Sequence, residues 1–139
     1  MKVVKAWEEA GVEIPAPFQR RIKVLFAPDK EGVKEITFSH AILPPQGRTD
    51  YHSHDRPELI FVVSGEGLCV HEGVETPIKE DMAMWVPAAE LHQIINTGYV
   101  PIKLATVFIP AYTAAENYGR CLDAAKAMEP GQGSSPPAL

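Results

Sequence analysis

Long apolar runs, positive charge and cysteine are scarce in this sequence, and each shortage excludes a class of protein. No apolar run reaches the roughly 20 residues that a membrane-spanning helix needs. Residues 1–15 contain acidic side chains and lack the apolar core of a signal peptide. The formal net charge of −5 at pH 7 argues against binding to nucleic acid, whose phosphates attract clustered lysine and arginine. We therefore expect a cytoplasmic protein without a membrane or nucleic-acid partner.

Cysteine occurs only twice in the 139 residues, at Cys69 and Cys121, which lie far apart in the sequence. We expect both thiols to be reduced, as is usual in the cytoplasm, and to serve as small buried side chains. The chain length suits one domain, and a hydrophobic content of 45% is enough to form a core.

Short β-type runs separated by turn residues fill the middle of the chain. We expect strands at nine places: residues 20–26, 34–43, 50–54, 58–63, 68–71, 74–78, 82–86, 91–95 and 102–109. Strands at this regular spacing, with no long helix among them, predict an all-β sandwich or barrel.

The two ends of the chain differ from this middle part. We expect an N-terminal arm over residues 1–19, with a short helix over 3–10 and an extended segment over 12–18. After the barrel, predicted over residues 20–110, a helix should occupy 111–128, and residues 129–139 have the composition of a disordered tail.

The C-terminal helix has a recognisable start. Thr113 followed three residues later by Glu116 fits a capping box, so the helix should run from Ala114 to about Met128. Its packing face should contain four residues: Tyr118, Cys121, Leu122 and Ala125.

Histidine and glutamate gather around one short stretch. On an extended strand His52 and His54 point to the same face, because residues i and i+2 share a side. Pro57 cannot donate a ladder hydrogen bond, so the strand should turn there and bring Glu58 back beside the histidines. With His92 as a fourth ligand from elsewhere, this set predicts a site for a divalent metal.

Residues 47–65, GRTDYHSHDRPELIFVVSG, resemble the first motif of the cupin superfamily. That motif reads Gly, five residues, His-x-His, three or four residues, Glu, six residues, Gly; this stretch has four residues after its first glycine and otherwise fits. The second cupin motif reads Gly, five residues, Pro-x-Gly, two residues, His, three residues, Asn. Residues 81–96 fit it, with Asp81 and Ala89 in place of the two glycines.

The resemblance is to small single-domain cupins of the conserved-barrel type, and it implies a single double-stranded β-helix, or jelly-roll, barrel. Inside it, one divalent transition metal (Fe, Mn, Ni, Co or Zn) would be held by His52, His54, Glu58 and His92. Ligand type alone does not choose among these metals. In six-coordination, two positions would stay open for a hydroxy acid, keto acid, enediol or catechol, or for one substrate oxygen and O₂.

Further candidates surround the predicted ligands. Asn96 shares the strand face of His92 and would orient a ligand, or else it is a turn residue before Thr97-Gly98. Tyr51 and Arg56 flank the first motif and would meet an anionic substrate, or else belong to a solvated loop. We take these three as candidate catalytic residues. Six residues are expected to line an apolar pocket: Ile60, Val62, Ile94, Leu104, Thr106 and Phe108.

Residues 59–63, LIFVV, are apolar at every position. A strand with one wet face alternates, so this strand should be covered on both sides. The cover could be the N-terminal arm, the C-terminal helix or a second subunit, and the cupin resemblance favours a homodimer.

Three functions are compatible with these features. The first is a metal-dependent cupin enzyme that acts on a small oxygenated organic molecule, anionic ones included, as a dioxygenase, decarboxylase or other lyase. The second is a sugar isomerase or epimerase of the same fold, which would need several polar groups in the pocket. The third is a non-catalytic small-ligand-binding module. We favour the enzyme because a complete ligand set with open positions and an apolar wall suits catalysis.

Overall fold

A computed structural model describes residues 1–128, so the predicted disordered tail over 129–139 lies outside the described residues. The elements, in chain order, are a 3₁₀ turn η1 (Ala6–Glu8), strands β1 (Val12–Ile14), β2 (Arg20–Phe26), β3 (Thr37–Leu43), β4 (Glu58–Ser64), β5 (Glu66–His71), β6 (Val74–Lys79), β7 (Ala83–Val86), β8 (His92–Ile95) and β9 (Ile102–Phe108), and helix α1 (Ala114–Ala127).

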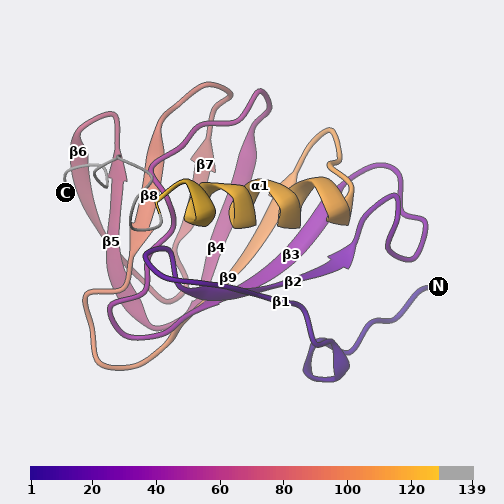
Figure 1. Ribbon diagram of the computed structural model, residues 1–139, viewed down its shortest axis with the longest axis horizontal. Helices are drawn as coiled ribbons and strands as arrows, with labels where there is room; N and C mark the ends of the chain where they lie inside the picture. The colour runs from indigo at the N-terminus through magenta and orange to yellow at the C-terminus, as the bar shows by residue number, and fades with distance from the viewer. Residues whose placement is uncertain (129–139) are drawn as a thin grey trace.

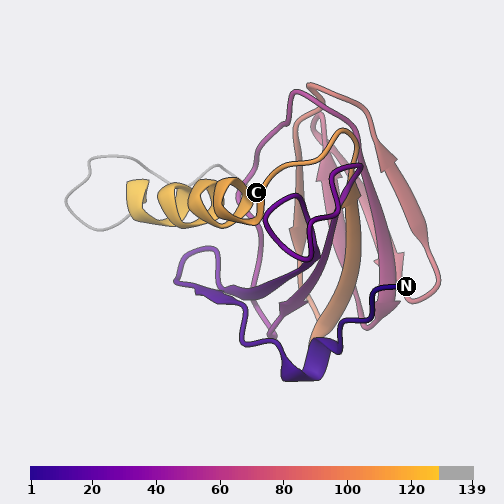
Figure 2. The ribbon, with the colours of Figure 1, turned by 90° about the vertical axis from the view of Figure 1, so that its right-hand side faces the viewer.

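These strands form two antiparallel sheets that face each other (Figures 1 and 2). The larger sheet has the order β1-β2-β3-β9-β4-β7, and the smaller one has the order β6-β5-β8. The predicted all-β jelly-roll fold with a C-terminal helix is confirmed. Within residues 1–128, no helix has the length and apolar character needed to cross a membrane.

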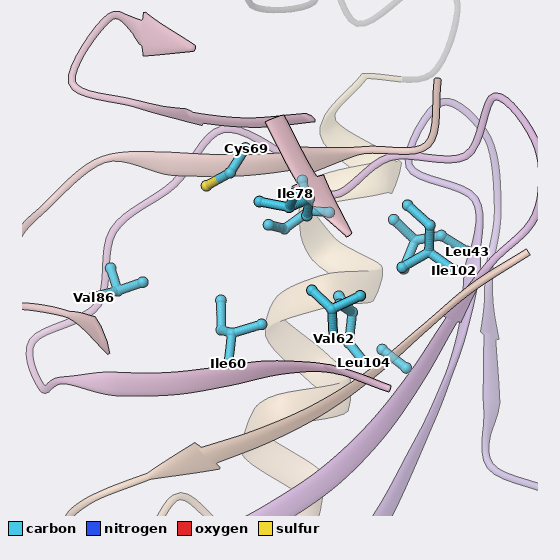
Figure 3. Close-up of a cluster of buried hydrophobic side chains, with 10 residues drawn as sticks. Leu43, Ile60, Val62, Cys69, Ile78, Val86, Ile102 and Leu104 are labelled. Carbon is cyan, nitrogen blue, oxygen red and sulfur yellow. The ribbon is translucent and has the colours of Figure 1, made fainter. Parts of the chain in front are cut away.

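The core lies between the two sheets because the strands alternate inward and outward side chains. On β4 the inward residues are Glu58, Ile60 and Val62, and β3 and β9 show the same period of two. Figure 3 shows Ile60 and Val62 among the apolar side chains that fill this space, with Cys69 on the opposite sheet. The interior is therefore apolar along most of β4 and becomes acidic only at its first residue.

Helix α1 crosses one side of the barrel (Figures 1 and 2). Its predicted capping box is present, since Glu116 N–H donates to Thr113 Oγ1 and Thr113 N–H donates to Glu116 Oε1. The predicted packing face is wrong at Leu122, which is 38% exposed.

The buried residues of α1 are Asn117, Cys121 and Ala125, of which the last two pack with Ile14, Phe18 and Ile22. Tyr118 is half-buried, and its hydroxyl accepts a hydrogen bond from the backbone N–H of Val24. The buried face of α1 therefore includes Asn117 in place of the expected Leu122.

Two further segments differ from their predictions. The helix expected over residues 3–10 shrinks to the single turn η1, and part of the expected arm forms β1, which pairs with β2. Residues 50–54 do not form a regular strand; His52 makes only an isolated bridge to His92. The strand predicted there is therefore wrong, although the segment stays close to β8.

The outer face of β4 is only partly covered within residues 1–128. Leu59, Phe61 and Val63 are 38%, 39% and 41% exposed, and Trp85 on the neighbouring β7 is 59% exposed. The arm, the helix and a second subunit were the three covers left open for this strand. Helix α1 packs against Ile14, Phe18 and Ile22 instead, and cover by a second subunit stays a prediction.

Candidate metal centre

Backbone pairing between residues 46–52 and β8 brings two histidines side by side. Thr49 N–H donates to Ile94 O (2.9 Å), His52 N–H to His92 O (3.1 Å), and His92 N–H to His52 O (2.8 Å). His54 is held separately, because the backbone N–H of Ala89 donates to its carbonyl oxygen (2.7 Å). Backbone hydrogen bonds between the two predicted motifs thus hold His52, His54 and His92 near one another.

The four predicted ligands form one cluster. One ligand atom from each of His52, His54, Glu58 and His92 lies within 4.8 Å of all the others. The Nε2 atoms of His52 and His54 are 2.9 Å apart, and Glu58 Oε1 lies 3.2 Å from His92 Nε2 and 3.6 Å from His54 Nε2. His54, Glu58 and His92 are buried, and His52 is half-buried. The cluster could hold a metal ion.

Hydrogen bonds at the Nδ1 atoms of His52 and His92 determine which tautomer each ring adopts. His52 Nδ1 lies 2.7 Å from the carbonyl oxygen of Asp50, and His92 Nδ1 lies 2.9 Å from that of Glu90. A carbonyl only accepts, so each Nδ1 carries the hydrogen and each Nε2 presents its lone pair to the centre of the cluster. This is the tautomer that metal ligation through Nε2 requires.

The environment keeps two of the imidazoles neutral. Burial, followed by the charge of Arg120, lowers the pKa of His52 well below its usual value and the pKa of His54 to about 3. Burial also opposes protonation of His92, but the hydrogen bond and charge of Glu58 outweigh it and raise the pKa of that ring. Of these three rings, His92 is therefore the one that accepts a proton most readily.

Backbone conformation and close packing explain why the first cupin motif has glycine at Gly47 and Gly65. Gly65 has φ +88°, and a Cβ on Gly47 would lie 2.7 Å from the carbonyl oxygen of Gln19. Asp81 and Ala89, which replace the two motif glycines, both have φ +70°. Both keep the left-handed conformation that glycine adopts more easily, so each replacement preserves its own turn, between β6 and β7 at Asp81 and between β7 and β8 at Ala89.

A cavity of about 60 Å³ opens onto the cluster. Five of the six residues expected in its wall line it: Ile60, Ile94, Leu104, Thr106 and Phe108. Val62 instead belongs to the apolar core between the sheets. The volume is a fraction of the 300–1,000 Å³ or so typical of drug-sized ligand sites, so this cavity suits an ion and a molecule of few heavy atoms.

The three candidate catalytic residues are not among the residues that line this cavity. Asn96 is fully buried at a turn, where its amide donates to Leu43 O (3.0 Å) and Val100 O (2.8 Å) and accepts from Gly98 N–H (2.9 Å). These bonds match the turn role that we left open for it.

Arg56 is also engaged elsewhere. Its guanidinium pairs with Asp55 (2.8 Å), donates to Ala111 O (2.7 Å) and lies over the Tyr112 ring at 3.7 Å. Tyr51 is half-buried beside His52 in the sequence. The structure therefore does not bring Tyr51, Arg56 or Asn96 to the cavity wall.

Sequence reasoning missed the polar residues that do line the cavity. These are Arg20, Ser39, Thr49, Asn117 and Arg120, and Asp50 pairs with both arginines. Arg20 carried a usable signal, because it shares strand parity with the buried Ile22 and Val24. Arg120 carried none, because its direction depends on the rotation of α1.

Comparison with known proteins gives a family and two curated relatives. Residues 39–108 match the family described as the cupin domain. An uncharacterised protein of Methanocaldococcus jannaschii is 29% identical over 84 residues, which cover 60% of this chain and 66% of that protein. An oxalate-binding protein of Thermotoga maritima is 30% identical over 77 residues, covering 55% and 64% respectively. The chain thus spans slightly less than two thirds of each relative.

Solved structures share the fold. A predicted oxalate decarboxylase of Thermotoga maritima superposes with TM-score 0.71 at 24% identity and covers 78% of this chain and 99% of its own. A polyketide cyclase of Streptomyces resistomycificus gives 0.70 at 19%, covering 78% and 79%. A sugar phosphate isomerase of Silicibacter pomeroyi gives 0.58 at 20%, covering 65% and 59%. The family match spans half of the chain and contains all four clustered side chains, so this protein belongs to the cupin family.

Proposed function

We propose that this protein is a mononuclear metal-dependent enzyme that acts on a small oxygenated organic acid, as a dioxygenase or as a decarboxylase or other lyase. One observation carries the proposal. One ligand atom from each of His52, His54, Glu58 and His92 lies within 4.8 Å of the other three, and three of the four side chains are buried. Three imidazole nitrogens and one carboxylate are a donor set that suits a divalent transition metal.

The residues of the chain have distinct tasks in this proposal. His52, His54, Glu58 and His92 hold the metal, which supplies Lewis-acid or redox chemistry when bound. The backbone carbonyls of Asp50 and Glu90 orient two of the rings. Ile60, Ile94, Leu104 and Phe108 exclude water and lower the local dielectric constant around a bound substrate.

The size of the cavity favours a small acid over a sugar. At about 60 Å³ it has little room for a sugar phosphate beside a metal ion. The oxalate-binding relative and the predicted oxalate decarboxylase of the same fold support a substrate of few heavy atoms. A sugar isomerase and a non-catalytic binding module are the alternatives. The polar residues in the cavity wall would suit a sugar, but the cavity volume does not.

Substrate consumption tests the proposed function. Protein purified without an affinity tag would be loaded in turn with Fe²⁺, Mn²⁺, Co²⁺, Ni²⁺ and Zn²⁺ and incubated with oxalate and short hydroxy and oxo acids. We expect turnover with at least one metal, followed by NMR and by O₂ uptake. Consumption only in air indicates a dioxygenase, and equal consumption without O₂ indicates a decarboxylase or lyase. Tight binding without turnover across the whole series would leave a binding module.

The exposed apolar face of β4 and β7 supports a further part of the proposal, a homodimer. This face carries four large apolar side chains that are each partly exposed: Leu59, Phe61, Val63 and Trp85. A contiguous exposed apolar patch is typical of an interaction surface. A second copy of the chain would bury this face and explain the absence of alternation in the sequence of β4.

Introducing charge on this face is expected to dissociate the dimer. In light scattering at micromolar concentration, the wild type should have twice the mass of the chain, and Leu59→Glu/Phe61→Glu the mass of one chain. Val74→Glu, at a position 55% exposed on β6, is the control and should stay dimeric. A monomeric wild type would refute the homodimer.

A further inference from the structure

Two arginines share one carboxylate in the wall of the metal cavity. Arg120 Nη1 lies 3.1 Å from Asp50 Oδ2, and Arg20 Nη2 lies 3.6 Å from Asp50 Oδ1. Arg20 is only 2% exposed, and Asp50 is 8% exposed. Both arginines line the same cavity as the four clustered ligands. Asp50 balances only one of the two guanidinium charges, so this wall has an excess positive charge.

Unpartnered polar atoms lie in the same wall. Within residues 1–128, the buried Nε of Arg120 and the buried Oγ of Ser39 have no hydrogen-bond partner. Both residues line the cavity, and Ser39 is only 2% exposed. Buried polar atoms are normally paired, so these two groups point to a polar occupant of the cavity.

The charges of the whole cavity indicate the charge of that occupant. Glu58 neutralises one charge of a divalent ion, and neutral imidazoles neutralise none. One positive charge at the ion and one positive charge at the two arginines would therefore remain uncompensated. A substrate with two negative charges compensates both, whereas a neutral sugar or a monocarboxylate leaves a buried charge uncompensated.

We propose that the substrate is a short dicarboxylate, with one end on the metal and the second carboxylate held by Arg120 and the hydroxyl of Ser39. This inference rests on the proposed metal site. The cavity volume of about 60 Å³ limits the acid to a few heavy atoms. Both Arg20 and Arg120 lie outside the matched residues 39–108, so the assignment does not come from the family match.

Arg120 is better placed than Arg20 to bind a carboxylate. Arg20 donates through Nη1 to Phe18 O (2.8 Å) and is almost fully buried, so it holds Asp50 and contributes charge. The side chain of Arg120 is 32% exposed, and within residues 1–128 its one hydrogen-bond partner besides Asp50 is the Sγ of Cys121 (3.1 Å), which is a weak acceptor. A carboxylate can replace that sulfur contact and bond the free Nε of the same planar fork.

Two acids that differ by one carboxylate test the assignment. Glycolate and tartronate share a chelating hydroxy-acid end, and tartronate adds a second carboxylate. Calorimetry on Co²⁺-loaded protein should show tartronate binding at least about tenfold more tightly than glycolate, since a charge-assisted hydrogen bond is worth that much. In Arg120→Gln this preference should disappear, while glycolate affinity and bound Co²⁺ stay unchanged.

Arg21→Gln is the matched control, because Arg21 lies next to Arg20 but faces outward and pairs with Glu13. It should keep the preference for tartronate. If the glutamine variant at Arg120 does not fold, Arg120→Met keeps the aliphatic stem and gives the same measurement. Bound Co²⁺ with no preference in the wild type, or with an unchanged preference in the Arg120 variant, overturns the dicarboxylate assignment alone. Failure of the wild type to bind Co²⁺ overturns the proposed function as well.

Discussion

Replacing His52 and His54 together by alanine is expected to abolish stoichiometric binding of a divalent transition metal and all turnover, while the barrel stays folded. Only His92 and Glu58 would remain, and two ligands do not hold such an ion against water. The fold should survive because residues 50–54 lie outside the regular strands. Metal content after dialysis at fixed free metal should fall from about one ion per chain to near zero, and circular dichroism should be unchanged.

Two other histidines provide the control. His40 lies on β3, and His71 on β5, where its ring pairs with Thr76 Oγ1 (2.9 Å). Neither belongs to the cluster, so His40→Ala and His71→Ala should retain a full complement of metal. If the double variant at 52 and 54 still binds one ion per chain, the ion is held elsewhere and the proposed centre is wrong.

The cluster of four side chains could be predicted from the sequence, but the backbone pairing that forms it could not. We expected a regular strand to align His52 with His54. The alignment comes instead from irregular pairing of residues 46–52 with β8, which exchanges two hydrogen bonds between His52 and His92. The motif spacing predicts that the four side chains lie together. It does not predict the backbone pairing responsible, because His52 pairs with His92 on a strand some 40 residues away in the sequence.

The wall of the cavity was less predictable because it depends on a helix rotation. Residues 114–127 contain many alanines and few large apolar side chains, so the sequence pattern of α1 does not define one face strongly. The contacts of Cys121 and Ala125 with Ile14 and Ile22 decide the rotation, and they turn Arg120 into the cavity. Such contacts between distant segments are not encoded in any local pattern.

The apolar run of β4 illustrates the same limit at the surface. The pattern correctly marked the outer residues Leu59, Phe61 and Val63 as unusual for a strand that faces water. The pattern did not identify what covers these side chains, because apolar residues indicate that a surface is buried without indicating which segment or subunit buries it. The structure places helix α1 against Ile14, Phe18 and Ile22 instead.

Acid is expected to release the metal, because each imidazole binds a metal only in its neutral form and protons compete for the same Nε2 atoms. Glu58 raises the pKa of His92, so this ring should be the first of the three to accept a proton. Metal content across a pH series should be complete at pH 8 and close to zero at pH 4. Full retention at pH 4 would argue against three imidazole ligands.

The metal-free barrel should also become less stable as the pH falls. The direction of this change follows from the pKa values of His52 and His54. The folded-state pKa of His54 is about 3 and that of His52 is well below 6.5, the value for an exposed imidazole. Between these values the unfolded chain binds protons that the folded chain does not, so falling pH favours unfolding. His92 acts oppositely, because its raised pKa adds stability below pH 6.5 that is lost as the pH rises.

His54 alone, whose pKa falls from 6.5 to about 3, gives a loss towards acid on the order of a few kcal/mol, at about 1.4 kcal/mol per pKa unit. The lowered pKa of His52 adds to this loss, and the raised pKa of His92 opposes it. The melting temperature of metal-stripped protein should therefore fall between pH 6.5 and 4, and the extra stability of loaded protein should vanish with it. In His52→Gln/His54→Gln, which cannot titrate at these positions, the curve should be flatter. A stripped wild type that melts higher at pH 4.5 than at pH 7 would show that these rings are not held neutral. The polar, buried cluster would then be stabilised by protons alone, without need of a metal.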